Sequence, residues 1–253
     1  MNNTTASLPL LLKELRLNAF VKNWEKLSHA ATDEQWLPQE YLAKLCEEEV
    51  AERYHKRLLR MMRDSQLPPS KSLVDFEYTA VPSIKANQVN LLIQDMSWVD
   101  RHENLLLFGP SGVGKTHLAA AIGSVLVEKN IRTKFITATA IVQLLQKAKQ
   151  ELELVQALEK LDKYAVLIID DIGYVKKSDL ETSVLFELIA HRYESGSMII
   201  TSNQAFGDWD KMFDDNMMTV AAIDRLVHHA CILELKAESY RKKQSMERKN
   251  KTR

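Results

Sequence analysis

The chain has 253 residues, 45% of them hydrophobic, and its 34 basic and 34 acidic residues balance, so any affinity for nucleic acid must come from local basic surfaces. Its two cysteines, Cys46 and Cys231, lie far apart and exclude both a CxxC redox motif and a cysteine-rich metal site. No apolar run approaches the roughly 20 residues of a membrane-spanning helix, and no basic region precedes an apolar stretch at the start, so we expect a cytoplasmic protein without a membrane partner.

The first 70 residues are predicted to form a small all-helical domain. Leucines recur near helical spacing between residues 8 and 17, and residues 41–62 contain neither glycine nor proline. Pro68 and Pro69 end this section, and residues 71–96 are predicted to be a linker into a larger domain. We therefore expect two domains, residues 1–70 and 71–253, with the boundary near residues 67–72.

Beyond the linker, short apolar runs alternate with segments of helical length, a pattern typical of βαβ units and a mainly parallel sheet. The predicted strands are residues 104–108, 133–137, 165–169, 197–201 and 231–235. The predicted helices are residues 115–129, 139–161, 179–194 and 218–229. This larger domain is thus predicted to be α/β.

The segment from Gly109 to Thr116 matches the phosphate-binding P-loop, GxxxxGK[ST], and lies between a predicted strand and a predicted helix, as the motif requires. Lys115 is expected to reach the β- and γ-phosphates of ATP, and the Thr116 hydroxyl to bind Mg²⁺. The alternative is a glycine-rich turn without a ligand. The predicted nucleotide contacts in this segment are Gly109, Pro110, Ser111, Gly112, Val113, Gly114, Lys115, Thr116 and His117.

Polar residues also follow two later strands. Asp170 and Asp171 end one apolar run, and parallel strands of an open α/β sheet bind ligands at their carboxyl ends. We assign Asp170 to the Mg²⁺ shell and Asp171 to the attacking water, with a simple turn-capping pair as the alternative. Asn203, after the strand at 197–201, is a candidate to hold the same water, although Thr-Ser-Asn is also common in turns.

Basic residues recur at spacings of three and four on the helix predicted near residues 47–63, where they could bind the phosphate backbone of double-stranded DNA. These predicted DNA contacts are Arg53, Lys56, Arg57, Arg60 and Arg63, together with Lys176 and Lys177 elsewhere in the chain. The alternative is a solvent-exposed face paired with the glutamates one turn upstream. The pair His228 and His229 has no metal-ligand partners at suitable spacing and is predicted to be structural.

The chain resembles the AAA+ ATPases of the DnaC and IstB group at residues 104–123, 167–174, 198–203 and 222–226. Residues 66–78 and 201–209 look closer to the IstB-type transposition helpers of insertion sequences than to helicase loaders. The resemblance implies an αβα sandwich with a five-stranded parallel sheet in the order 5-1-4-3-2. It also implies that Asn203, between the P-loop strand and the Asp170 strand, is the polar sensor residue. Too few residues follow Arg225 for a full helical lid.

The resemblance further implies a homo-oligomer in which ATP lies between neighbouring subunits. Arg225 matches the arginine that reaches the γ-phosphate of the next subunit, and Arg241 matches a second phosphate-sensing arginine. A surface ion pair for Arg225 and a solvated tail for Arg241 are the alternatives. The expected function is ATP hydrolysis by a transposition helper that assembles on double-stranded DNA and engages a cognate transposase. A DnaC-like helicase loader and a DNA scaffold that binds nucleotide without useful hydrolysis remain alternatives.

Overall fold

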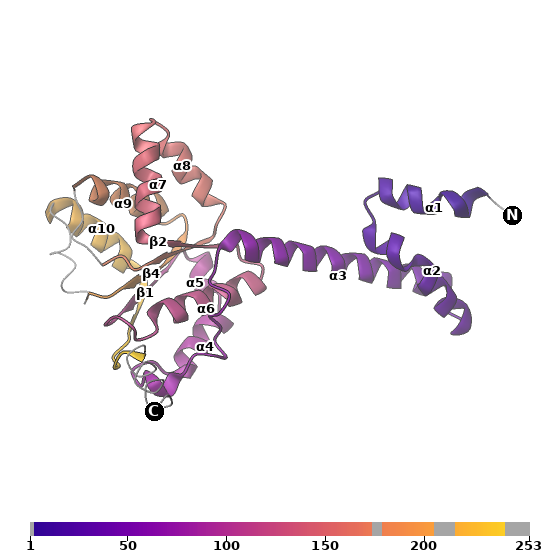
Figure 1. Cartoon of the computed structure of the whole chain (residues 1–253), viewed down its shortest axis with the longest axis horizontal. Helices are drawn as coiled ribbons and strands as arrows, with labels where there is room; N and C mark the ends of the chain where they lie inside the picture. The colour runs from indigo at the N-terminus through magenta and orange to yellow at the C-terminus, as the bar shows by residue number, and fades with distance from the viewer. Residues whose placement is uncertain (1–2, 174–178, 205–215, 241–253) are drawn as a thin grey trace, which may run out of the picture. The chain divides into compact units, whose positions relative to one another are not determined.

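The computed structural model describes residues 3–173, 179–204 and 216–240 (Figure 1). The chain divides into two compact units, Met1–Arg60 and Met61–Arg253. The helix α3, Pro38–Ser65, runs through this division, and the boundary predicted near residues 67–72 lies just after its end. Among the described residues, no helix combines the length and apolar character that a bilayer span needs.

The first unit consists of α1 (Asn3–Glu14), α2 (Asn18–Asp33) and the larger part of α3. Its core is small and centres on Leu12, Phe20 and Leu45. The buried Glu49 carboxylate accepts hydrogen bonds from the Ala19 N–H at the start of α2 and from Arg53, both at 2.7 Å. Burial acts to raise the pKa of Glu49, but these hydrogen bonds outweigh it and the pKa is lowered. A charged cap therefore fixes the start of α2.

The second unit contains a five-stranded parallel sheet in the order β2-β3-β4-β1-β5, which is the predicted order 5-1-4-3-2 read from the other edge. The strands are β1 (Asn104–Phe108), β2 (Thr133–Thr137), β3 (Val166–Asp170), β4 (Ser197–Ser202) and β5 (Ala230–Glu234). Each predicted strand is confirmed to within one residue at either end. Long apolar runs in β1, β3 and β4 reflect their burial on both faces.

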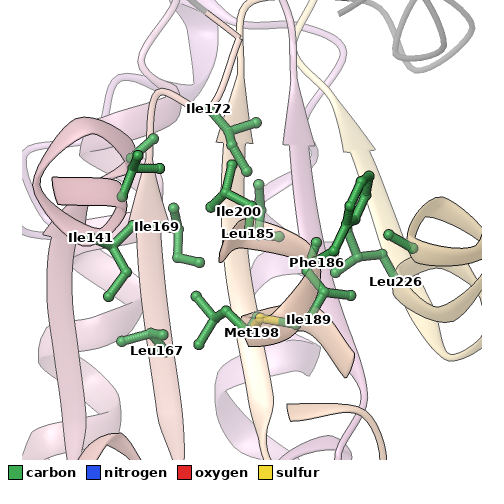
Figure 2. Packing of buried hydrophobic residues seen from close by; sticks show 14 of the residues in the cluster. Ile141, Leu167, Ile169, Ile172, Leu185, Phe186, Ile189, Met198, Ile200 and Leu226 are labelled. Atoms are coloured by element: carbon green, nitrogen blue, oxygen red, sulfur yellow. The ribbon is translucent and has the colours of Figure 1, made fainter. Parts of the chain in front are cut away.

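Helices cover both faces of this sheet, so the predicted αβα sandwich is confirmed (Figure 1). One face packs against α7 (Ala138–Gln150), α8 (Leu154–Asp162), α9 (Asp179–Arg192) and α10 (Asn216–His228). Successive strand residues alternate between the two cores: Leu167 and Ile169 contribute to this one, and Ile168 to the other. Figure 2 shows Leu167 and Ile169 beside Ile141 of α7.

The opposite face packs against α4 (Ala86–Gln94), α5 (Ser97–Asp100) and α6 (Lys115–Glu128). The prediction that residues 71–96 form a linker is wrong, because Phe76, Val81, Ile84 and Val89 are buried in this core. Val89 lies in α4, whereas a short 3₁₀ turn, Tyr78–Ala80, is the only helix or strand between Phe76 and Ile84. Apolar residues in irregular structure show no period, so their burial is not visible in the sequence.

The single helix predicted at residues 139–161 is also wrong, because α7 and α8 are separated at residues 151–153. Leu152 has a φ of +59°, and its neighbour Glu153 donates a backbone hydrogen bond to the Ala148 carbonyl at 2.7 Å. This left-handed residue ends α7 in the way a glycine commonly does. No glycine or proline marks the break, so the helical pattern of the sequence runs through it.

The starts of β3 and β4 are tied together by Arg192 at the end of α9, which is 1% exposed. Its guanidinium donates to the carbonyls of Tyr164, Ala165 and Ser197 at 2.9 to 3.1 Å. Burial lowers the pKa of Arg192, an effect that nearby Asp162 opposes. This contact holds in register the two strands whose opposite ends carry the candidate site.

Candidate nucleotide-binding site

The P-loop leads from the end of β1 into α6 and uses backbone conformations that favour glycine. Gly112 and Gly114 have φ values of +84° and +102°. A Cβ atom on Gly109 would overlap the Leu235 carbonyl, and one on Gly112 would overlap the Ser239 hydroxyl. The loop is thus packed closely against the segment that follows β5, and its N–H groups lead into the start of a helix, an arrangement suited to phosphate.

Lys115 begins α6 and is only 7% exposed. Its Nζ donates hydrogen bonds to the carbonyl oxygens of Gly109, at 2.7 Å, and Pro110, at 2.8 Å. The ammonium group is therefore held at the loop. A positive charge beside the N-terminus of a helix is suited to binding an anion.

Asp170, at the end of β3, lies beside the P-loop, as predicted from its place at the carboxyl end of a parallel strand. Its Oδ2 accepts a hydrogen bond from the Thr116 hydroxyl at 3.2 Å, and its side chain is buried. A hydroxyl and a carboxylate are the hard oxygen ligands that Mg²⁺ prefers, and Mg²⁺ commonly takes one or two protein oxygens with the rest from water and phosphate. No group of three or more acidic, histidine or cysteine ligands occurs among the described residues. Thr116 and Asp170 therefore fit a phosphate-linked Mg²⁺.

Thr201 of β4 connects the two acidic residues and was not singled out in the sequence. Its hydroxyl donates to Asp170 Oδ1 at 2.6 Å and accepts from the Asp171 N–H at 2.8 Å. Asp171 has a φ of +66°, a conformation that aspartate and asparagine tolerate better than most residues. Because β4 lies next to β3, the strand order is the signal that could have found this contact.

Asn203, two residues further on, is partly buried and lies beside Gly173. A Cβ on Gly173 would lie 2.6 Å from Asn203 Oδ1, so only glycine allows this approach. That oxygen is buried and has no hydrogen-bond partner among the described residues. A buried acceptor without a hydrogen bond lowers the stability of the fold, and a hydrogen bond donated by a water or a ligand at this position would remove that penalty.

These groups converge on one pocket of about 540 Å³ at the carboxyl ends of the strands. The predicted residues that line it are Ser111, Gly112, Val113, Gly114, Lys115, Thr116, His117, Asp171 and Asn203. Gly109 and Pro110 are not among the lining residues, and their carbonyls instead bind Lys115. Asp170 is not a lining residue either, but it accepts a hydrogen bond from Thr116, which does line the pocket.

One wall of this pocket comes from the segment that the sequence left as a linker. Phe76, Ala80 and Val81 line it, and the Phe76 ring packs edge-on against His117 with centroids 5.5 Å apart. The Nε2 of His117 lies 2.8 Å from the Ser72 carbonyl, to which it can donate. Tyr240, whose N–H donates to the Gly112 carbonyl at 3.1 Å, also lines the pocket. This wall is of mixed character, because Lys71, Asp75 and Glu77 of the same segment also line the pocket.

Arg225 is exposed near the end of α10 and is not a lining residue of this pocket. It lines a second pocket together with Asn104, the first residue of β1, whereas the P-loop follows the last residue of β1. Arg225 and the P-loop of the same chain thus lie at opposite ends of the sheet. Arg241, the other arginine implied by the resemblance, is outside the described residues.

The predicted DNA-contacting residues of α3 differ in their surroundings. Arg53 donates to Glu49 at 2.7 Å and to the Arg16 carbonyl at 3.1 Å, and Lys56 pairs with Glu52 at 2.6 Å. The remaining three are exposed and have no ion pair within the described residues: Arg57, Arg60 and Arg63. Lys176 and Lys177 lie outside the described part of the chain.

The histidine pair makes local contacts: His228 Nδ1 lies 3.2 Å from the Tyr193 hydroxyl, and the His228 and His229 rings are 4.0 Å apart. No metal-ligand cluster involves either residue in the described ranges.

Comparison with known proteins agrees with this geometry. The profile of the family described as IstB-like ATP binding protein matches residues 10–248. An insertion-sequence ATP-binding protein of Sinorhizobium fredii is 47% identical over 96% of this chain and 82% of its own length. The corresponding protein of insertion sequence IS21 from Pseudomonas aeruginosa is 37% identical over 94% of this chain and 89% of its own.

Solved structures share the fold at lower identity. The DnaC helicase loader is 22% identical with a TM-score of 0.53, covering 59% of this chain and 87% of that one. AMPPCP-bound DnaA from Aquifex aeolicus is 16% identical with a TM-score of 0.56, covering 74% and 56%. Together with the sheet order and the P-loop pocket, the sequence relatives confirm the resemblance: the chain belongs to the family of IstB-like ATP-binding proteins and has the AAA+ fold.

Proposed function

We propose that the chain hydrolyses ATP as a helper of transposition, in an assembly of identical subunits that binds double-stranded DNA and engages a cognate transposase. Hydrolysis is supported above all by one observation: Lys115, Asp171 and Asn203 line the same pocket, and Asp170 accepts a hydrogen bond from Thr116 of that lining. The names of the relatives, which are ATP-binding proteins of insertion sequences, support the role in transposition.

The proposed reaction is phosphoryl transfer from ATP to water, in which the protein contributes mainly positioning and charge. Lys115 and the N–H groups of the P-loop bind the phosphates. Mg²⁺ held by Thr116 and Asp170 would neutralise charge on the phosphate oxygens. Asp171 orients or activates the attacking water, and Asn203 Oδ1, which has no partner among the described residues, accepts a hydrogen bond from it.

Among the described residues that line the nucleotide pocket, Arg225, the cation that the resemblance places at the γ-phosphate, is not included. Arg225 lies at the far end of its own sheet, where it can reach only the nucleotide of another subunit. An arginine supplied from a neighbour would stabilise the charge of the transition state and make turnover depend on assembly. In this proposal hydrolysis controls the assembly state on DNA.

A phosphate-release assay with and without duplex DNA tests this function. We expect turnover, and we expect the mass of the complex with ATP and DNA to equal that of the bound duplex plus two or more subunits with their nucleotides. Bound ATP without turnover in either condition would instead favour the nucleotide-binding scaffold. The helicase-loader alternative is less well supported, since the relatives at 37–47% identity are insertion-sequence proteins and the likeness to DnaC concerns the fold.

Thr201→Val should lower kcat by about tenfold while the affinity for ATP changes little. Valine keeps the shape of the side chain but removes the hydroxyl that holds Asp170 and the Asp171 N–H, a loss on the scale of one hydrogen bond to a charged group. Steady-state phosphate release and nucleotide titration measure the two quantities. Thr201→Ser retains the hydroxyl and should stay close to the parent chain. Equal turnover in the Val and Ser variants would refute the positioning role of Thr201.

Replacing both Arg57 and Arg60 with alanine should weaken DNA binding by a similar factor for every duplex sequence. Each arginine on a phosphate contributes about one unit to the slope of log affinity against log salt, so the slope should become shallower by about two. Fluorescence anisotropy across a salt series measures it. Lys44→Ala is the matched control on the same helix, because Lys44 is exposed but already pairs with Glu47 at 2.9 Å. An unchanged slope in the double variant would remove these arginines from the DNA interface.

A further inference from the structure

A second pocket, of about 240 Å³, surrounds Arg225 at the end of the sheet opposite the P-loop. Its lining residues come from the segment before β1, from the first residue of β1 and from the ends of α9 and α10. They include Arg101, His102, Glu194, Arg225 and His229, and we call this recess the Arg225 pocket. Nothing in the sequence singled out Arg101.

Arg101 is held in a fixed orientation within this pocket. Its Nε and Nη2 donate to the two carboxylate oxygens of Glu103 at 2.6 and 3.2 Å, and its Nη1 donates to the Ser97 hydroxyl at 2.6 Å. The hydrogen bond to Glu103 raises the pKa of Arg101, and the same bond lowers the pKa of Glu103. These bonds leave an N–H on each terminal nitrogen without an acceptor among the described residues. The guanidinium is therefore preorganised and can still donate to a ligand.

The two arginines of the Arg225 pocket present N–H donors to a ligand. Arg101 and Arg225 are both exposed, and Arg225 has no ion pair within the described ranges. Glu103, which is bound by Arg101, and Glu194 in the lining match the two arginines in formal charge. The feature that suits an anionic ligand is therefore the pair of guanidinium groups as hydrogen-bond donors.

We propose that the Arg225 pocket closes over the ATP phosphates held by the P-loop of a neighbouring subunit, and that Arg101 acts there as a second cation beside Arg225. This inference rests on the proposed function and extends it to Arg101, a residue for which the sequence predicted no role. A recess of this size suits the end of a phosphate chain, whereas a DNA duplex follows an extended basic surface. The P-loop of the same chain is excluded, because it lies at the other end of β1.

Arg101 would donate its remaining N–H groups to phosphate oxygens whose charge is redistributed in the transition state. Because Glu103 and Ser97 already hold its guanidinium, little reorganisation is needed when the neighbour arrives. Arg101→Ala should therefore lower turnover by about tenfold or more, the scale of one charge-assisted hydrogen bond. ATP affinity of the isolated subunit should not change.

A mixing experiment tests whether Arg101 acts on the neighbouring subunit. The recipient chain carries Arg101→Ala and keeps its own P-loop intact. The donor chain carries Asp171→Asn, so that it supplies Arg101 and Arg225 but does not hydrolyse ATP. Phosphate release is measured for each chain alone and for recipient with increasing donor. A recipient that carries Arg225→Ala, mixed with the same donor, is the matched control. A second recipient carries Arg101→Gln, which keeps a polar side chain beside Glu103 and Ser97 but removes the positive charge.

We expect both Arg101 recipients to be slow alone and to gain turnover as donor is added, as the Arg225→Ala recipient does. Parent-like turnover in the Arg101 recipients alone would overturn the proposal. The proposal would also be overturned if the donor restored the turnover of the Arg225→Ala recipient but not that of the Arg101 recipients. Arg101 would then act within its own subunit. If the donor restores no recipient, the intersubunit site of the proposed function fails, and the role of Arg101 fails with it.

Discussion

Lys115→Ala is expected to weaken ATP binding by about ten- to a hundredfold and to abolish ATP-dependent assembly. The Lys115 ammonium is buried at the P-loop, where it has lost most of its contact with water and is compensated by the Gly109 and Pro110 carbonyls. Its bonds to phosphate would be charge-assisted, and each such bond contributes roughly 1.5–3 kcal/mol. Titration with a fluorescent ATP analogue, followed by mass measurement with ATP, checks both effects.

Lys129→Ala is the matched control for this experiment. Lys129 follows the other end of α6 and also donates to two backbone carbonyls, those of Ile93 and Gln94, but it is not a lining residue of the nucleotide pocket. It should bind ATP like the parent chain. If Lys115→Ala and Lys129→Ala bind ATP equally well, the assignment of the P-loop is wrong.

Asp171→Asn should leave ATP binding intact but slow hydrolysis by about a hundredfold or more, the usual contribution of a positioned general base. Asparagine suits this test because it tolerates the left-handed backbone at Asp171, where φ is +66°, and keeps the N–H that donates to Thr201. The slowed chain should also stay longer on DNA, because hydrolysis would no longer end the assembly. Single-turnover hydrolysis and dissociation from labelled duplex DNA measure the two rates.

Asp162→Asn provides the control for the loss of a carboxylate. Asp162 lies before β3, at the end away from the P-loop pocket, where it bonds to His191. Turnover of this variant should match the parent chain. A parent-like rate in Asp171→Asn would remove Asp171 from the reaction and leave Asn203 as the remaining candidate to hold the water.

Strong local signals explain which parts of the fold and site were predictable. Buried parallel strands read as continuous apolar runs, and all five strands were located to within one residue at either end. The P-loop is local as well, since its glycines, Lys115 and Thr116 occur in one short segment. The order of the strands came from the family resemblance, because no local pattern specifies which strands become neighbours.

Contacts between distant segments explain what was missed. The break at Leu152 leaves the helical period of the sequence intact, and Phe76 and Val81 become a wall of the nucleotide pocket only when residues 71–81 fold onto α6. Thr201 has no distinguishing feature in the sequence, because its contact with Asp170 forms only when β4 pairs with β3. The pairing of Arg53 with Glu49, one turn upstream, is the alternative that the sequence offered, whereas its bond to the distant Arg16 carbonyl could not be predicted.

The sequence by itself determined that this protein has a P-loop, a buried parallel sheet and acidic residues at the end of one strand, because each depends on residues adjacent in the chain. Only the tertiary structure decided that Thr201 links Asp170 to Asp171, and that Arg225 lies at the opposite end of the sheet from its own P-loop. The physical reason is that a parallel strand separates its two ends by its full length. A cation at the start of the sheet is therefore too far from the P-loop of its own chain to bind the same phosphate.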